Sequence, residues 1–493
     1  MIAQRGMGEL MTAWFPGGAS LTAADLAVFA ALLAVMIAIG RRAGAATKTN
    51  VDYFRAGRGL PWPAAGLALL SAEVSTLTLL GVPAASFTRD WTYPQFFLGA
   101  FVARVLVAVW FLPAFFRSRG ATPYAYLGRR FGPLTRSAGA AAFLATRLVV
   151  ASIRLLAMCV AAGALLGWGP WPTLALLTAV SIAALAGGGV RSAVWTGVFQ
   201  AAGFLAVGAL SILFLARRID GGLITAWNMA SDAGKLRIFD GGTPAFWAAV
   251  SAGFFGSAAA FGADHELAQK LLAVKDARDA CRAMMLSLFG SLLVLFLYMS
   301  VGTLLFVFFK QNPGMALPAR PDQIFPHFAA TAMPRFLRGL VLGAIVLASI
   351  DLPLASLATA FVGDLRPAPP GAEPRAPRAA AVVFALLLAV LAVLFGRSDA
   401  VRSLAFKAGG VAAGPLLGIF LLGLVSRRRG DLPVVSVFGA MVALNWILLV
   451  LSENGLLPIS WGQLIPFEAV ATCVAAWALL SIVRPRAAPR PAP

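Results

Sequence analysis

A carboxylate and several hydroxyl groups lie in the middle of an apolar stretch, residues 61–87. The carboxylate is Glu73, and the hydroxyl-bearing neighbours are Ser71, Ser75, Thr76 and Thr78. The stretch is long enough to cross a bilayer, which takes about 20 apolar residues. Because a bilayer core leaves charge and loose backbone unsatisfied, such a stretch must line a cavity or a binding site. A spanning helix that is polar at mid-depth is what a transporter uses to hold an ion and a solute.

The composition places the chain among polytopic membrane proteins. Of its 493 residues, 60% are hydrophobic and only 12% are charged, and the mean hydropathy is +0.84. A soluble domain has about 25% charged residues, so no soluble core could accommodate this sequence. The net charge of +20 does not indicate nucleic-acid binding. The basic residues lie mostly in short loops between apolar runs, where they set the topology.

Window length predicts an all-α membrane protein with about thirteen spans in one domain, residues 1–493. The predicted spans are 23–40, 61–87, 95–116, 137–166, 170–187, 190–216, 244–266, 280–309, 336–364, 378–396, 401–425, 432–452 and 460–483.

Basic residues alternate between the loops, and this alternation predicts the orientation. One set of loops contains Arg41, Arg42 and Lys48 after the first span and the run 427–429 near the end. The positive-inside rule places that set in the cytoplasm. With an odd number of spans, the N-terminus then lies outside and the C-terminus inside, across the plasma (inner) membrane.

Several blocks of the chain resemble the sodium/solute symporter family, which includes sodium-coupled carriers of sugars, proline, pantothenate, sialic acid and iodide. The blocks are DYFRAGRGLPWPAAGLALLSAEVSTLTLLGVPAASF (52–87), ATPYAYLGRRFG (121–132), GGGVRSAVWTGVFQ (187–200), GADHELAQKLLAVKDARDACRA (262–283), ASIDLPLASLATAFVGDL (348–365) and AGGVAAGPLLGIFLLGL (408–424). They occur in order over most of the chain, and together they are specific.

The resemblance implies the LeuT-type fold, in which ten core helices form two inverted five-helix repeats. The repeats would cover about 61–216 and 244–425, with extra helices at about 23–40, 432–452 and 460–483. An inverted repeat predicts that the first helix of each half is interrupted. We predict one interruption near 71–83, at Gly81 and Pro83, and the other near 255–262, where small residues would let the backbone unwind. The alternative for the second region is ordinary close packing of small residues.

The resemblance also implies a sodium site between the first and the eighth core helices. In the family, the first of these helices supplies two carbonyl groups, and the eighth supplies one carbonyl and two hydroxyls. The matching positions are Ser71, Val74, Ile345, Ala348 and Ser349. Positions 345, 348 and 349 share one helix face, and oxygen ligands suit a hard cation.

Ala348 departs from the family pattern, which has serine or threonine at this position. One hydroxyl ligand is therefore missing, and a proton-coupled or uncoupled carrier stays open as an alternative. Asp351 is a possible compensating ion ligand. Pro353 has no N–H, so in a continuous helix it would free the carbonyl of Ser349 as a ligand. The alternative is that Pro353 is a tolerated kink and that Asp351 pairs with an arginine.

A second departure concerns the family motif WTDVxQ, whose aspartate is tied to an extra sodium position or to the ion path. This chain has Trp195-Thr196-Gly197-Val198-Phe199-Gln200. Because the carboxylate is absent, we expect no second sodium at this place.

The sequence does not identify the solute. We predict a substrate cavity at Glu73, Ser75, Thr78, Ser257, Ala260 and Phe261. Sugar-carrying relatives have other residues at the positions of Glu73, Ser257 and Ala260, so a hexose is not supported. Glu73 could contact a cationic group of the solute or pair with an arginine inside the membrane. Three arginines interrupt apolar helices and need partners, and if they face the cavity they favour an anionic or zwitterionic solute. They are Arg104, Arg147 and Arg154.

Two other classes of function are alternatives. Asp264, His265 and Glu266 could act in acid–base catalysis, but no nucleophile motif accompanies them, so we predict a carrier and not an enzyme. A transporter fold used as a membrane sensor is the other alternative. We expect a small-molecule solute and the lipid bilayer as partners, no nucleic acid and a monomer. The expected ion is sodium as the coupling ion, with no cofactor and no other metal.

Overall fold

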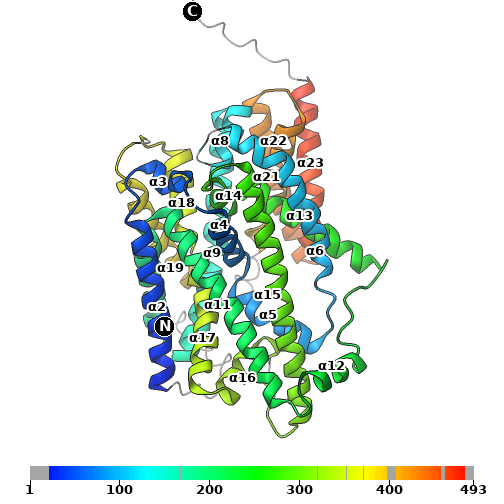
Figure 1. Ribbon diagram of the computed structural model, residues 1–493. Helices are drawn as coiled ribbons and strands as arrows, with labels where there is room; N and C mark the ends of the chain where they lie inside the picture. The colour runs from blue at the N-terminus through cyan, green and yellow to red at the C-terminus, as the bar shows by residue number, and fades with distance from the viewer. Residues whose placement is uncertain are drawn as a thin grey trace, which may run out of the picture.

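The computed structural model describes residues 22–482 except 119, 121, 167, 319, 351, 370, 397–406 and 457–460. The described residues form helices and connecting turns, and they contain no β-strand beyond an isolated bridge between Leu60 and Val274. The predicted all-α membrane architecture is therefore confirmed. Figure 1 shows long helices running side by side, with α3 and α8 at one end of the bundle and α12 and α16 at the other.

The helices of the first half, in chain order, are α2 (Ala23–Gly44), α3 (Asn50–Arg55), η1 (Ala56–Arg58), α4 (Trp62–Glu73), α5 (Thr76–Thr88), α6 (Gln95–Leu106), η2 (Val107–Phe111), α7 (Leu112–Arg117), α8 (Pro123–Arg130), α9 (Pro133–Leu166), α10 (Pro170–Ser181), η3 (Ile182–Ala186) and α11 (Gly189–Arg218). The second half contains α12 (Gly222–Asp232), α13 (Pro244–Gly262), α14 (His265–Leu272), α15 (Ala277–Gln311), η4 (Pro321–Gln323), α16 (Ile324–Ala332), α17 (Arg335–Ile350), α18 (Leu354–Ala360), η5 (Phe361–Leu365), α19 (Arg375–Phe395), α21 (Ala413–Val425), α22 (Asp431–Glu453) and α23 (Trp461–Ile482).

Judged by helix length and composition, the structure has fewer membrane spans than the sequence predicts. Within the described part of the chain, nine helices can cross a bilayer, or ten if the bent pair α4 and α5 counts as one span. Shorter apolar helices stand at three other predicted spans, namely α10 with η3, α18 with η5, and α21. The predicted count of thirteen is therefore not confirmed.

The first predicted interruption is present, but it lies at Val74 and Ser75. Both residues are extended, and the helices on either side of them are bent by 62°. The N–H of Ser75 donates to Oγ1 of Thr78 at 3.4 Å, so a new helix begins here with its own N-terminal cap. The prediction that Gly81 and Pro83 make the break is wrong, because both lie inside the continuous helix α5.

The second predicted interruption, near 255–262, is wrong. Helix α13 is continuous from Pro244 to Gly262. Its small residues serve close packing instead: a Cβ added to Gly253 would overlap the carbonyl of Phe96 on α6, and one added to Gly99 of α6 would overlap the carbonyl of Val250. Close packing of small residues, the alternative weighed above, therefore accounts for this segment.

An interruption that the sequence did not predict separates α17 from α18. Helix α17 ends at Ile350, and Pro353 stands immediately before α18 with φ −74° and ψ 40°. The expectation that Pro353 lies within a continuous helix is therefore wrong. The last carbonyls of α17 lack helical donors because the helix ends. Asp351 and the side chain of Ser349 lie outside the described residues.

Candidate functional site

The break between α4 and α5 exposes backbone oxygens at two positions of the predicted sodium site. The N–H of Val74 still donates to the carbonyl of Leu70 at 3.0 Å, which completes α4. The next N–H, that of Ser75, donates to Thr78 instead of Ser71. The N–H of Thr78 in turn donates to the carbonyl of Ser75 at 2.9 Å and not to Val74. The carbonyls of Ser71 and Val74 therefore lack their helical donors, and both residues are buried.

Helix α11 contacts both helices that the predicted sodium site requires. Gly197 packs against α4, where an added Cβ would lie 2.6 Å from Oγ of Ser71. One turn further on, Nε2 of Gln200 donates to the carbonyl of Leu347 on α17 at 2.9 Å. Residues 197 and 200 lie on the same face of α11. The helix break and the last turn of α17 thus meet on one face of α11, with Ile345 and Ala348 both buried on α17.

The glycine at position 197 has a structural reason. The same added Cβ would lie 3.0 Å from Cα of Ala68, a backbone atom that cannot turn away. In this packing of α4 on α11, an aspartate has no room. The close approach of α4 and α11 therefore requires that the aspartate of the family motif is absent at position 197.

A lysine brings a positive charge close to this region. Lys270 of α14 is buried, and its Nζ lies 3.4 Å from the carbonyl of Ala68. The same carbonyl accepts the hydroxyl of Ser71 at 3.0 Å. Glu266 lies 3.7 Å from Lys270 and partly balances its charge. The sequence gives no spacing signal for this contact, because α14 and α4 are about two hundred residues apart.

Three of the predicted cavity residues converge on Arg104 of α6. The guanidinium pairs with Glu73, donates to Oγ of Ser257 at 3.3 Å, and lies 4.1 Å from the ring centroid of Phe261. It also donates to Oγ of Ser287 at 2.9 Å. Glu73 is therefore paired inside the membrane, as one of the two sequence alternatives proposed. Its other carboxylate oxygen, Oε1, is buried and has no hydrogen-bond partner among the described residues.

The remaining predicted cavity residues do not join this cluster. Thr78 lines a separate hollow of about 310 Å³, together with Gly81 and Val82 of α5 and with Asp90 beyond it. Ser75 contacts Thr78 through its backbone. Ala260 is half-buried on α13. The single cavity that the sequence predicts is therefore two places in the structure, the cluster around Arg104 and the hollow that Thr78 lines.

The loop between α12 and α13 is fastened beside the hollow. Nζ of Lys235 donates to the carbonyls of Phe87 and Arg89 at 2.5 and 3.1 Å. Arg237 forms an ion pair with Asp90 at 2.9 Å. Burial acts to raise the pKa of Asp90, but hydrogen bonds from Thr92 and Arg237 outweigh it, so this pKa lies below its usual value.

The two acidic residues of the enzyme alternative, Asp264 and Glu266, are held in ion pairs. Arg147 of α9 binds Asp264 at 3.0 Å and Glu266 at 2.5 Å. The Oδ1 of Asp264 also caps α14 by accepting the N–H of Glu266 at 2.8 Å. These groups join α9 to α14, and no cluster of metal-ligating residues occurs in the described part of the chain.

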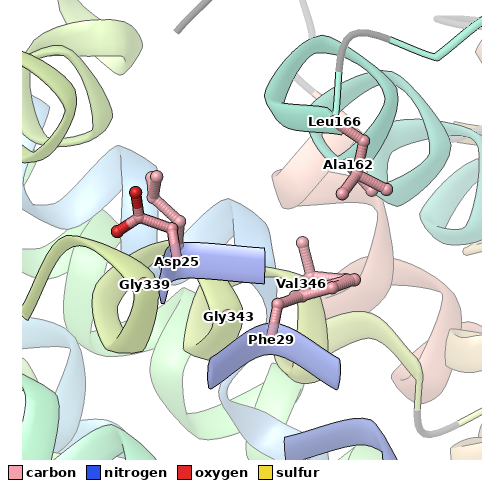
Figure 2. A pocket seen from close by; sticks show the side chains of 8 residues that line it. Asp25, Phe29, Ala162, Leu166, Gly339, Gly343 and Val346 are labelled. Carbon is pink, nitrogen blue, oxygen red and sulfur yellow. The ribbon is translucent and has the colours of Figure 1, made fainter. Parts of the chain in front are cut away.

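A small hollow near Asp25 is not a solute site. Figure 2 shows it between Asp25 and Phe29 of α2, Ala162 of α9, and Gly339 and Gly343 of α17. Its volume of about 10 Å³ is that of a single water molecule. The carboxylate of Asp25 is paired with Arg338, which joins α2 to α17.

Comparisons with known proteins agree with this geometry. A model of the Sodium:solute symporter family matches residues 53–445. A sodium/sialic acid symporter of Proteus mirabilis is 27% identical over 85% of this chain and 88% of its own length. Sodium-coupled monocarboxylate transporter 1 of Homo sapiens is 26% identical over 85% of this chain and 71% of its own length.

One solved structure shares the whole fold. It is a Na⁺-coupled sialic acid symporter in a substrate-bound, outward-open state, with a TM-score of 0.82 and 22% identity, and the match covers 94% of this chain and 98% of that one. The family match spans more than half of the sequence, and it includes the break at Val74 and the helices that carry the predicted ion ligands. The chain therefore belongs to the sodium:solute symporter family.

Proposed function

We propose that this protein carries a small organic anion across the membrane together with sodium, by alternating access. Family membership supports a sodium-coupled symporter and not an enzyme. The observation that carries the mechanism is the break at Val74 and Ser75, which meets the last turn of α17 on one face of α11. Sodium would bind the carbonyls of Ser71, Val74 and Ile345 and the hydroxyl of Ser349.

The proposed solute class rests on the relatives and on the basic residues inside the membrane. The relatives are described as carriers of sialic acid, monocarboxylates and iodide, all of them anions at neutral pH. This chain places Arg104 beside Glu73 at the helix break and Arg147 between α9 and α14, each beside an aromatic ring. Both guanidinium groups are paired with carboxylates in this structure, so a carboxylate solute would share their N–H donors with those side chains.

The driving force for accumulation follows from the charge of the ion. At −100 mV, one positive charge that moves inward supplies about 2.3 kcal/mol. This corresponds to roughly fifty-fold accumulation of a neutral solute, before the sodium gradient is counted. An anion carried with one sodium gains nothing from the voltage, so net uptake of an anion against the potential requires the sodium gradient or a second cation.

The orientation, the domain organisation and the oligomeric state also belong to the proposal. The basic end of the bundle, with α3 and α8, would face the cytoplasm of the inner or plasma membrane. The N-terminus would lie outside and the C-terminus inside. The chain would act as a monomer, with α2, α22 and α23 outside two five-helix repeats.

A proton-coupled carrier is the second candidate, because Ala348 supplies no hydroxyl to the ion site. In that case a proton gradient would replace the sodium gradient. Both candidates share the fold, so only the dependence of uptake on each ion separates them.

Uptake by purified protein in liposomes tests the proposal. Lactate and N-acetylneuraminic acid should be accumulated in a sodium gradient, and lactamide, the neutral amide of lactate, should not. Uptake that follows a pH gradient in choline buffer would select the proton-coupled candidate. Uptake of lactamide at the rate of lactate would overturn the anionic solute class.

A further inference from the structure

A groove of about 450 Å³ lies at the end of α2, away from the ion and solute sites. Helices α2 and α19, η3 and the turn between η3 and α11 line it. Apart from Arg41 and Arg378, its lining consists of glycine, alanine and one isoleucine. No carboxylate lines the groove, so its two arginines give it a positive charge. Because most of the lining side chains are glycine and alanine, backbone atoms form much of its wall.

One of the two arginines is held in place at the wall. Nε of Arg378 donates to the carbonyl of Gly187, and Nη2 donates to the carbonyl of Thr47, both at 3.0 Å. These bonds fix the plane of the guanidinium and join α19 to η3 and to the turn after α2. Glu373 lies 4.0 Å from Nη1 and is itself 55% exposed, so it neutralises Arg378 only weakly.

The other arginine is available to a ligand. Arg41 is exposed, and its guanidinium forms no hydrogen bond or ion pair with any residue that the structure describes. It lies in the last turn of α2, a helix that is apolar enough to span the bilayer and that ends at Gly44. The groove therefore opens at the level of the membrane surface. Two guanidinium groups in an otherwise uncharged hollow suit a phosphate, which they bind through paired N–H donors.

The helix that carries Arg378 also exposes an apolar face. Beyond Arg378, helix α19 exposes Val383, Leu386 and Val390. Their spacing of three and four residues places them on one side of the helix, along its length. A ligand with a phosphate head and apolar tails matches the groove and this face together.

We propose that the groove binds the phosphate head group of an anionic phospholipid from the cytoplasmic leaflet, with its acyl chains along α19. The bound lipid would bridge α2 and α19, which lie in different parts of the fold. It would therefore stabilise the packing of the extra N-terminal helix on the second half of the core. This inference goes beyond the proposed transport function and does not depend on the solute.

Lipid binding to the full-length protein tests the proposal, with native mass spectrometry and thermal unfolding as readouts. Dioleoylphosphatidylglycerol should bind and raise the unfolding temperature, whereas dioleoylphosphatidylcholine and glycerol 3-phosphate should do neither. Arg41→Ala should weaken phosphatidylglycerol binding about fivefold, since a basic residue near the surface contributes about 1 kcal/mol. The matched control is Arg42→Ala, which removes the same charge from the next, also exposed, residue outside the groove.

Three results would overturn the proposal. Equal losses of phosphatidylglycerol binding in Arg41→Ala and Arg42→Ala would mean that the lipid is attracted to a basic surface in general and not to the groove. Glycerol 3-phosphate binding as tight as that of the lipid would mean a site for a soluble phosphate compound. Ala183→Phe fills the groove without a change in charge, and full retention of phosphatidylglycerol binding in that folded variant would place the lipid elsewhere. If Ala183→Phe does not fold, the comparison of Arg41 with Arg42 still decides.

Discussion

Arg104 shows what a sequence can and cannot say about a single residue in a membrane helix. Its charge inside an apolar run predicts a buried partner, and the structure provides one in Glu73. The sequence cannot select that partner, because the two residues lie on different helices and several carboxylates were possible. The packing of α4, α6 and α15 makes the choice, with Ser291 of α15 donating to the same carboxylate at 3.2 Å.

The first prediction removes one partner of this pair. Glu73→Gln should lower the free energy of unfolding by about 3–5 kcal/mol, because it leaves the guanidinium of Arg104 buried without a counter-charge. The side chain of Arg104 is only 3% exposed, so water cannot take the place of the carboxylate. Denaturant titration of the protein in detergent measures the change.

The double variant Glu73→Gln, Arg104→Gln provides the internal check, because it removes both charges and should recover much of the loss. Lys407→Gln breaks a half-exposed pair with Glu453 and should cost less than about 1 kcal/mol. A loss in Glu73→Gln as small as that in Lys407→Gln would show that the Arg104 pair is not structurally important.

The second prediction concerns the ion site at Ala348. Ala348→Ser adds a hydroxyl on the buried face of α17, and it should tighten the apparent sodium affinity about tenfold, which corresponds to about 1.4 kcal/mol. Sodium titration of solute uptake measures it. Ala344→Ser, one turn earlier on the same helix, is the control and should change nothing, because Ala344 lines a different, apolar hollow.

Ser349→Ala removes a predicted ligand and should weaken sodium dependence. Pro353→Ala should leave sodium affinity unchanged, because Pro353 stands before α18 and not inside α17. If Pro353→Ala weakens sodium binding while Ala348→Ser has no effect, the site is rebuilt around a freed carbonyl and the ligand assignment at 348 is wrong.

At the scale of helices, the breaks matter more than the helices themselves. The sequence predicted a break in the right region, but composition alone pointed to Gly81 and Pro83. The actual break uses a local cap at Ser75 and Thr78, whereas Pro83 lies inside α5, and Gly302 of α15 packs closely against its carbonyl. The same small-residue signal on α13 reported helix packing and no break. Glycine indicates close approach or irregular backbone, and only the neighbouring helix decides which of them occurs.

The third prediction tests the contact of α11 with α4. Gly197→Ala should lower both the stability and the sodium affinity, because the added Cβ lies 2.6 Å from Oγ of Ser71 and forces α4 away from α11. Thermal unfolding with and without sodium measures both effects. Gly203→Ala lies on the same helix with no atom within 4 Å of its added Cβ, so it should be neutral. Equal behaviour of the two variants would mean that α4 does not depend on this approach.

At the scale of the whole molecule, two sets of ion pairs join segments that are far apart in the sequence. Arg147 ties α9 to α14 at one end, and Arg237 ties the α12–α13 loop to Asp90 at the other. Hydropathy predicted where the helices are, and loop charge predicted which end is basic. Neither pattern could pair residues across the bundle, because these contacts depend on the tertiary arrangement of distant helices.

The last prediction concerns the loop between α12 and α13 beside the hollow that Thr78 lines. Asp90 has a pKa below its usual value of 3.8, since hydrogen bonds from Thr92 and Arg237 outweigh the opposite effect of burial. For a carboxylate with a lowered pKa in the folded state, the stabilising contact is complete above the unfolded value and is lost as pH falls through the folded one. The pair with Arg237 should therefore stay intact down to about pH 4, and Asp90→Asn should not change the shape of the uptake profile between pH 5 and 8.

The same variant, like Arg237→Gln, should release the loop and speed the labelling of Thr78→Cys by an impermeant thiol reagent, in a background without the three native cysteines. Arg320→Gln is the control, because Arg320 pairs with Asp322 two residues away and does not line the hollow. A shift of the uptake profile within pH 5–8 in Asp90→Asn, or labelling as slow as in the control, would show that this loop does not govern access to the hollow.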